Sequence, residues 1–389
     1  MSDTDDLLLP EGVRLIHIGP HKTGTTAIQT SLHAALPTLA AHGVTRAGKA
    51  RHPALAVGYA VDHMLPYAKP RAGRRAWERL VADARSAPGG RVVVSSEYFS
   101  DADAAAAAKV VEAFGPDTHI VITLRPLVKI LPSQWQQYVL RGLRMPYEEW
   151  LRRILADDRS VASRVNPSFW KRHCHDELVE RWAAAAGTEN VTVIVLDPSD
   201  RGMLNRTFER MLGLPEGTLV DAGGENRSFT FQEAEALRAY NAAYLADGQD
   251  RALHARMART TVGAVVKERA PTQSEVPVPT PGWAVARAAE IGAEAAANIA
   301  ASGVRIIGDL GVLSLHGSGS DEVPPPDVPP DIAGRLALAV LKAHQSATEV
   351  EQAAAVSSGR VLKPLPTSML VRELIRRGRR RMGRVLRRG

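Results

Sequence analysis

HIGPHKTGTT, residues 17–26, is the segment from which the architecture of this chain follows. The apolar run 13–18 before it is typical of a buried strand, and 27–35 after it has the composition of a helix. Gly19 and Gly24 allow a tight turn between the two elements. Because the first amides of a helix carry the positive end of its dipole, this turn is typical of a phosphate or sulfate site.

The lysine of this loop is displaced from the place that ATP-binding loops give it. The pattern G-x-x-x-x-G-K-[ST] needs a lysine after the second glycine, but Thr25 stands there and the lysine is Lys22, inside the loop. The alternative is an ordinary tight turn with Lys22 as a solvated charge. The preceding strand, two glycines, a loop lysine and paired threonines together favour anion binding.

This loop resembles the 5'-phosphosulfate loop of sulfotransferases that use 3'-phosphoadenosine 5'-phosphosulfate (PAPS), including bacterial members. In that family a lysine precedes a [ST]-G-T-[TS] run. The resemblance implies that PAPS is the cosubstrate, that Lys22 is catalytic, and that no metal is needed. The residues that would bind the 5'-phosphate are Lys22, Thr23, Gly24, Thr25 and Thr26.

A second segment with the spacing of this family lies about a hundred residues later. The run 119–126 reads as a buried strand that ends in Arg125, and Ser133 follows eight residues later on a predicted helix. In the family, an arginine and a serine so placed hold the 3'-phosphate of the nucleotide, and a guanidinium suits a phosphate. The alternative is an Arg125 paired with a carboxylate and a Ser133 on a solvated face.

The resemblance also suggests a catalytic base. Glu97 ends the run 91–97, and the carboxyl end of a parallel strand is where ligands bind in such sheets. Several members of the family use a glutamate to deprotonate the acceptor hydroxyl. His21 is the competing candidate, since imidazole titrates near neutral pH. Glu97 has a structural alternative as a helix cap or as a partner of Lys22 or Arg125.

Other nucleotide-binding classes are weighed against this reading. A kinase or NTPase needs Mg²⁺ ligands, usually a Ser or Thr directly after the loop lysine and an Asp that ends another strand. Asp197 does end the run 191–196, but Pro198 follows it. A noncatalytic protein that acts through its basic tail would not need Lys22. We keep both classes as alternatives.

Alternating strand and helix patterns predict an α/β fold with three layers, helices on both faces of a central parallel sheet, similar to P-loop NTPases. We expect Pro132 to kink its helix or to confine the regular part to later residues. In the family an N-x-S-[LF] segment precedes a helix, and the loose match at 226–229 makes Arg227 a candidate contact to the 3'-phosphate. The predicted strands are 13–19, 91–97, 119–125 and 191–196, and the predicted helices of this part are 24–35, 75–86, 101–114, 127–142 and 200–212.

The resemblance covers residues 12–245, and composition divides the chain further. We predict a sulfotransferase domain at 1–245, a helical extension packed on it at 246–315, a Pro/Gly-rich linker at 316–333, and a helical segment with an arginine-rich tail at 334–389. The acceptor is expected to contact the variable segments 46–75 and 143–180. A sugar, a glycolipid and an acidic tyrosine-containing peptide all stay open as acceptors, and a glycolipid would suit the arginine-rich tail.

Charge is concentrated at the C-terminus. Residues 368–389 hold nine arginines and one glutamate, so the net charge of this segment exceeds the net charge of the whole chain, which is +7. The remainder of the chain is therefore close to neutral. Their apolar neighbours would form a basic amphipathic helix, which suits an anionic membrane surface or an acidic partner. The absence of interleaved aromatics argues against nucleic acid. A single cysteine, Cys174, and no visible secretory signal predict a cytoplasmic protein, peripheral at the inner membrane surface if the tail binds lipid.

Overall fold

The structure is a computed structural model in which the chain forms two compact units. Unit 1 comprises Met1–Trp135, Met145–Ser228 and Val278–Pro324, and unit 2 comprises Gln136–Arg144, Phe229–Pro277 and Pro325–Gly389. The boundaries expected at 245, 315 and 333 do not coincide with these units, because 278–324 belongs with the sheet. The structure describes residues 7–64, 68–87, 89–221, 227–248, 253–254, 262–317, 319–320 and 323–357.

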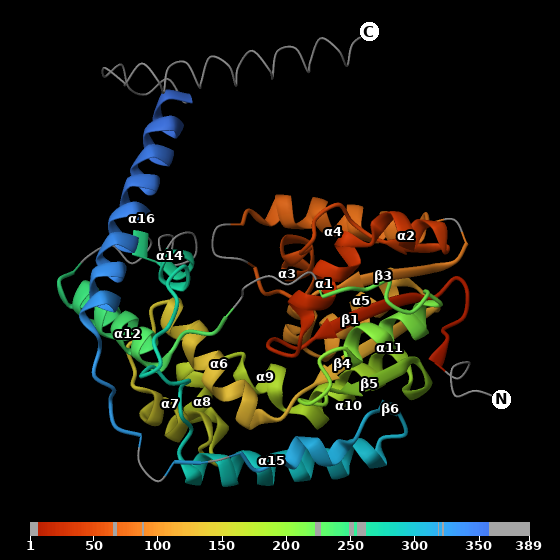
Figure 1. Ribbon diagram of the computed structural model, residues 1–389. Coiled ribbons are helices and arrows are strands. Elements are labelled where there is room, and N and C mark those ends of the chain that lie inside the picture. Colours follow the sequence, from red (N-terminus) through yellow and green to blue (C-terminus); the bar gives the residue numbers. More distant parts are fainter. Residues whose placement is uncertain are drawn as a thin grey trace. The chain divides into compact units, whose positions relative to one another are not determined.

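Unit 1 is built on one six-stranded sheet in which every pair of neighbours is parallel. The strand order is β2-β3-β1-β4-β5-β6 (Figure 1). This confirms the predicted α/β fold with a central parallel sheet. The strands are β1 (Arg14–Gly19), β2 (Val44–Arg46), β3 (Arg91–Ser95), β4 (Thr118–Leu124), β5 (Val191–Val195) and β6 (Arg305–Ile307).

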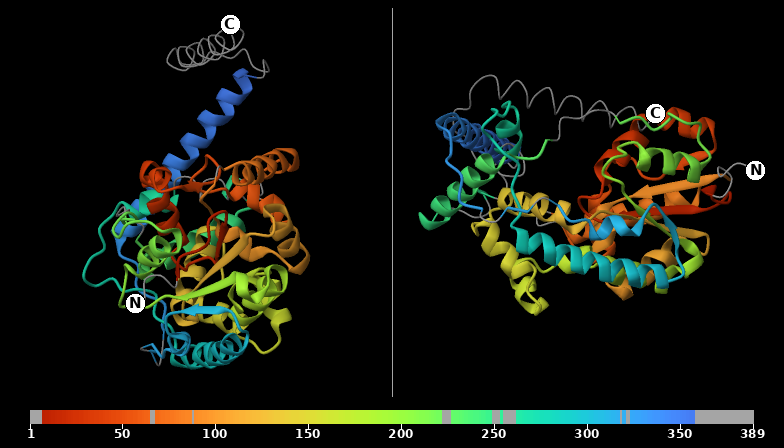
Figure 2. Two further views of the ribbon diagram at one scale, coloured as in Figure 1. Left: turned by 90° about the vertical axis from the view of Figure 1, so that its right-hand side faces the viewer. Right: turned by 60° about the horizontal axis from the view of Figure 1, so that its bottom comes forward.

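Two strands were absent from the prediction. β2 and β6 have three residues each, too few to give a periodic pattern. β6 pairs with β5, so the sheet extends one strand beyond 191–196, the last of the predicted strands. Figures 1 and 2 show β6 at the edge of the sheet with α15 (Gly282–Ala301) running beside it. The chain therefore returns to the sheet long after the segment that resembles the family.

Helices cover both faces of the sheet, which explains why its strands read as continuous apolar runs. On one face, Leu15, Val93 and Val121 pack against α1 (Thr25–Ala34), α2 (Leu36–Ala41) and α11 (Met203–Leu212). The opposite face carries Ile16, Val94 and Ile122. The helices that cover it, apart from α15, are α3 (Ala54–Ala60), α4 (Pro70–Arg85), α5 (Ala104–Phe114) and α10 (His175–Ala186).

The segment after β4 is helical, as predicted. α6 (Leu127–Leu140) has Pro132 inside it, so its regular part is not confined to later residues. The units divide within α6, after Trp135. Aromatic side chains of the following segments, Trp150 and Phe169 among them, are fully buried in unit 1. The remaining elements of unit 1 are α7 (Tyr147–Ile154), α8 (Arg159–Val165), α9 (Phe169–His173), and the 3-10 helices η2 (Glu97–Asp101), η3 (Thr188–Asn190) and η5 (Leu310–Ser314).

Unit 2 contains α12 (Phe231–Ala246), α14 (Gly263–Lys267) and α16 (Pro330–Ser357). α16 begins at Pro330, so its first turn lies within the segment predicted to be a linker, 316–333. The buried guanidinium of Arg269 joins three carboxylates of this unit, those of Glu233, Glu275 and Asp331. These ion pairs link the start of α12 to the start of α16.

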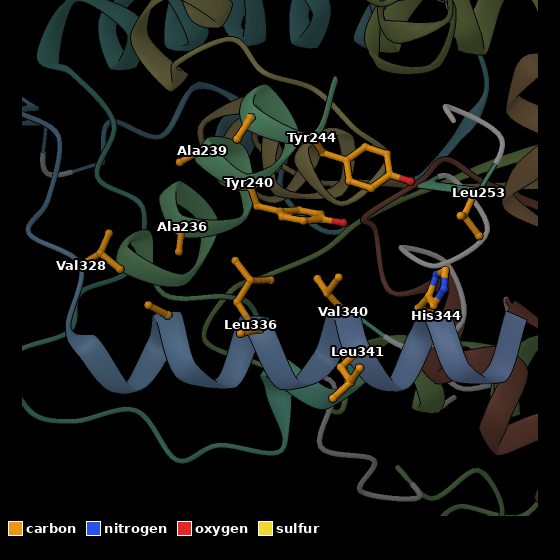
Figure 3. Close-up of a pocket in the computed structure, with 13 residues that line it drawn as sticks. Ala236, Ala239, Tyr240, Tyr244, Leu253, Val328, Leu336, Val340, Leu341 and His344 are labelled. Carbon is orange, nitrogen blue, oxygen red and sulfur yellow. The ribbon is translucent and has the colours of Figure 1, made fainter. Parts of the chain in front are cut away.

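Unit 2 also has an apolar pocket of about 910 Å³ between α12 and α16 (Figure 3). Tyr240 and Tyr244 project into it from α12, while Leu336 and Val340 reach it from α16. Alanines of both helices also line it, together with Leu253, Val328, Leu341 and His344. The arginine-rich tail, 368–389, lies outside the described residues. Within the described part of the chain, no helix has the length and apolar character needed to cross a membrane.

Candidate active site

The loop between β1 and α1 lies at the centre of the sheet edge, because β1 is flanked by β3 and β4. Gly19 and Gly24 both have positive φ, 79° and 85°, which explains the need for glycine at these two turns. Gly24 is the residue that caps α1, and no side chain forms a capping hydrogen bond there. The helix N-terminus therefore keeps the character of an anion site.

The loop lysine has an unusual backbone conformation. Lys22 has φ of 70°, a left-handed value that a residue with a side chain adopts rarely. Its side chain is half-buried. The left-handed turn places the lysine within the loop, two residues before the first helical cap. It differs in this from an ATP-binding loop, whose lysine belongs to the helix.

Two of the three threonine hydroxyls in this segment point inward. Thr23 Oγ1 donates to the carbonyl oxygen of Pro20 at 2.7 Å, and Thr25 Oγ1 donates to the same oxygen at 3.4 Å. Both side chains are buried, whereas Thr26 and Gly24 are exposed. The expected role of Thr23 and Thr25 in anion binding thus depends on their amides, because their hydroxyls already serve the loop.

Arg125 lies directly beside the loop, at the end of β4. Its Nη1 donates to the carbonyl oxygen of Lys22 at 3.4 Å, so the two predicted nucleotide-binding segments do meet. The side chain is half-buried, and burial lowers the pKa of the guanidinium from its usual value. An arginine remains charged after such a shift. Two cationic side chains, Lys22 and Arg125, therefore belong to one small region.

Ser133 follows on α6, half-buried and four residues after the exposed Lys129. Residues so spaced share a helix face. No hydrogen bond joins Ser133 to Arg125 among the described residues, so the pairing of these two groups stays a prediction. Arg227 is half-buried, and its Nη1 donates to the carbonyl oxygen of Ser228 at 3.1 Å. Its role at a 3'-phosphate also stays a prediction.

Glu97 lies against the loop from the other side. It is the first residue of η2, directly after β3, and a methyl group added to Gly19 would stand 3.1 Å from its Cα. This close approach, together with the positive φ, means that a side chain at Gly19 would be strained. The candidate base and the anion loop are therefore neighbours, as expected from the parallel order of β3 and β1.

Two residues near Glu97 were missed by sequence reasoning. Gln29, on the buried face of α1, donates from Nε2 to the Ser95 carbonyl oxygen at 2.9 Å and to Glu97 Oε2 at 3.3 Å. Its Oε1 accepts a hydrogen bond from Nδ1 of His52. Burial and the nearby charge of Arg51 lower the pKa of His52. A glutamine within a predicted helix carries no signal of such a role.

His21, the alternative base, is buried and packs edge-on against Tyr98, with ring centroids 5.4 Å apart. The ring of His63 also lies near Tyr98, with centroids 6.2 Å apart, and its Nδ1 comes within 4.0 Å of the Asp101 carboxylate. Asp101 is itself fixed by a buried two-point ion pair with Arg172, at 2.6 and 2.9 Å. The wall beside the loop is thus formed by η2 and by the segment that contains His52 and His63.

Under the loop, His17 connects three strands. Its Nδ1 lies 2.8 Å from Oγ of Ser95 on β3, and its Nε2 lies 3.2 Å from Oγ1 of Thr123 on β4. Thr123 Oγ1 in turn lies 2.7 Å from Oγ1 of Thr23. His17 is fully buried, which lowers its pKa to about 3. The imidazole is therefore neutral at physiological pH.

Among the described residues, no group of three or more His, Cys, Asp or Glu side chains is arranged to hold a metal ion.

No protein-family model matches this chain, and no curated protein matches it in sequence. Among solved structures it is similar to a sulfotransferase from Alicyclobacillus acidocaldarius, with 17% identity over 63% of this chain and 99% of that chain and a TM-score of 0.38. The interpretation of the site therefore rests on its own residues and geometry.

Proposed function

We propose that this protein is a sulfotransferase that moves the sulfuryl group of PAPS to a hydroxyl or amine of an acceptor. The observation that carries the proposal is the contact between the two predicted nucleotide segments, Arg125 Nη1 to the Lys22 carbonyl oxygen, at the N-terminus of α1. Glu97 lies on the other side of the same loop. An anion site, two cations and a carboxylate are what this reaction needs.

The residues present fit a sulfonucleotide. The N-terminus of α1 has no side-chain cap, so its first amides suit the oxygens of a 5'-phosphate. Lys22 would neutralise the charge that develops on the bridging oxygen as the S–O bond breaks. Arg125, with Ser133 and Arg227, would hold the 3'-phosphate. Thr26, exposed at the start of α1, is the one loop threonine whose side chain faces solvent.

The acceptor would be activated by Glu97. Its carboxylate takes the proton of the acceptor hydroxyl, the acceptor oxygen forms a bond to sulfur, and the S–O bond to the nucleotide breaks. The products are the sulfated acceptor and 3'-phosphoadenosine 5'-phosphate (PAP). The hydrogen bond from Gln29 fixes the Glu97 carboxylate next to the loop. His21, buried against Tyr98, is the alternative base.

The wall that contains His52, His63 and Tyr98 supports the assignment of 46–75 to acceptor binding. We further propose, from the charge of the sequence, that 368–389 contacts an anionic membrane surface or an acidic partner. We also propose a cytoplasmic location, which the single cysteine of the sequence favours.

The deciding measurement is the melting temperature of the protein with PAP in the absence of Mg²⁺. Binding to the folded state alone raises the stability by about 2.7 kcal/mol at a hundredfold excess over Kd. We expect a clear rise with PAP and none with ATP at the same concentration. No shift at millimolar PAP, or a shift that needs Mg²⁺ and ATP, would contradict the proposal and favour a kinase or NTPase.

A further inference from the structure

Four buried side chains form a chain of hydrogen bonds beneath the anion loop. In order they are Ser95, His17, Thr123 and Thr23, and their exposed fractions are 8%, 0%, 0% and 0%. They come from β3, β1, β4 and the loop itself. None of these groups except Thr23 was singled out from the sequence.

The chemistry of the partners fixes the direction of every bond in this chain. The Pro20 carbonyl can only accept, so the single proton of the Thr23 hydroxyl is used at 2.7 Å on that oxygen. Thr23 must then accept from Thr123 at 2.7 Å. The Thr123 hydroxyl, which also lies 3.2 Å from the Gly19 carbonyl oxygen, has no proton left for His17.

The tautomer of the imidazole follows. Since Thr123 cannot donate to His17, the proton between them belongs to Nε2 of the histidine. A neutral imidazole has one N–H, so Nδ1 is the acceptor and the Ser95 hydroxyl donates to it at 2.8 Å. Burial favours this neutral form, since the pKa of His17 is lowered to about 3. The chain is directed from Ser95 to the Pro20 carbonyl.

This direction has a consequence for the loop. A hydroxyl that donates to the Pro20 carbonyl holds that oxygen toward the sheet. Because a trans peptide is planar, its N–H points away from its C=O, so the amide of His21 is turned to the opposite side. The inward Pro20 carbonyl thus orients the peptide from which the His21 amide projects.

We propose that His17 is a positioning residue of the active site: its Nε2–H, acting through Thr123 and Thr23, sets the orientation of the 19–24 loop for anion binding. The effect on PAP rests on the proposed function, whereas the tautomer and the loop orientation do not. The four hydrogen-bonded side chains lie beneath the loop, so their effect on the reacting atoms is indirect.

The structure contains a matched control. His119 and Thr192 form a similar buried pair on β4 and β5, with Nε2 2.8 Å from Oγ1. Both are buried, at 6% and 0% exposure. Thr192→Val and Thr123→Val each remove one hydroxyl from a buried histidine–threonine pair at nearly constant volume. Of the two pairs, only His17–Thr123 is connected to the loop.

The first measurement is ¹⁵N NMR of the full-length protein labelled at histidine and glycine. We expect His17 to be the Nε2–H tautomer at pH 7 and the Gly24 amide signal to move in Thr123→Val but not in Thr192→Val. A Nδ1–H tautomer, a charged His17, or equal movement of Gly24 in both variants would overturn the inference. This result does not depend on which ligand the loop binds.

The second measurement is the Kd for PAP by calorimetry. Loss of a buried hydrogen-bond partner should weaken binding roughly tenfold in Thr123→Val, while Thr123→Ser stays within about threefold of wild type. Thr192→Val should bind as wild type even if it melts earlier. Equal Kd values in Thr123→Val and Thr192→Val would refute the positioning role. If wild type does not bind PAP, the proposed function fails, and the NMR result alone judges His17.

Discussion

Replacement of His175 with leucine tests how burial of a histidine couples stability to pH. His175 is the first residue of α10 and 2% exposed. Among the described residues its buried Nε2 has no hydrogen-bond partner. Burial lowers the pKa of His175 to about 4, although Asp176 acts in the opposite direction. His175→Leu therefore removes a titrating group of similar size without loss of a hydrogen bond at Nε2.

The sign and magnitude follow from proton linkage. In the unfolded chain a histidine binds its proton below about pH 6.5, whereas His175 in the folded protein binds it only below about pH 4. Between these values the unfolded state holds one more proton, so the free energy of unfolding falls as the pH falls. The slope is about 1.4 kcal/mol per pH unit, which gives about 2 kcal/mol between pH 6.5 and 5.

The assay is urea unfolding, followed by circular dichroism at pH 7 and pH 5. Wild type and His175→Leu share the other buried histidines, so those cancel in the comparison, apart from His173, whose pKa is lowered by burial and in part by the neighbouring His175. We expect the variant to lose about 2 kcal/mol less than wild type on acidification. A loss of the same size in both proteins would show that His175 is protonated in the folded state or accessible to solvent, and would refute the reasoning.

Three further predictions concern the reaction. Lys22→Ala should lower kcat by roughly 10²–10³-fold with a much smaller rise in the Kd for PAP. If the Kd of Lys22→Ala is unchanged and wild type shows no turnover, the protein is instead a noncatalytic binder. Glu97→Gln should lower kcat roughly 10²–10⁴-fold with PAP affinity retained, and a larger loss in His21→Gln would move the base to His21. Arg125→Lys should weaken the binding of PAP roughly tenfold, because a lysine cannot replace the planar fork of the guanidinium. In a competition assay, the binding of adenosine 5'-phosphosulfate, which has no 3'-phosphate, should be unaffected.

The parts of the fold that sequence predicted are those with long apolar runs. β1, β3, β4 and β5 are buried on both faces, so each appears as a mostly hydrophobic segment. β6 is only partly buried and three residues long, and it pairs with β5 from more than a hundred residues away. Such a strand is held by its partner and not by local preference, which a window on the sequence cannot detect.

Some residues of the candidate site could likewise be predicted from the sequence, and others could not. Lys22 and Gly24 belong to a local motif, and the order of the strands brings Arg125 and Glu97 to the same edge. Gln29 and His52 meet only through the packing of α1 against the segment after β2, a contact with no spacing rule. The inward direction of the Thr23 hydroxyl was also beyond the sequence, since a threonine donates equally well to a ligand or to its own loop.

Gln29 has a consequence for any attempt to change the acceptor. Its one amide group contacts the Ser95 carbonyl, the Glu97 carboxylate and the His52 ring at once. A library that randomises the residues around His52 therefore also disturbs the Glu97 carboxylate. The disturbance passes through Gln29, which lies outside the variable segment 46–75. Selections that hold Gln29 and His52 constant and vary only their outer neighbours should retain more active variants, because they separate acceptor recognition from the geometry of proton removal.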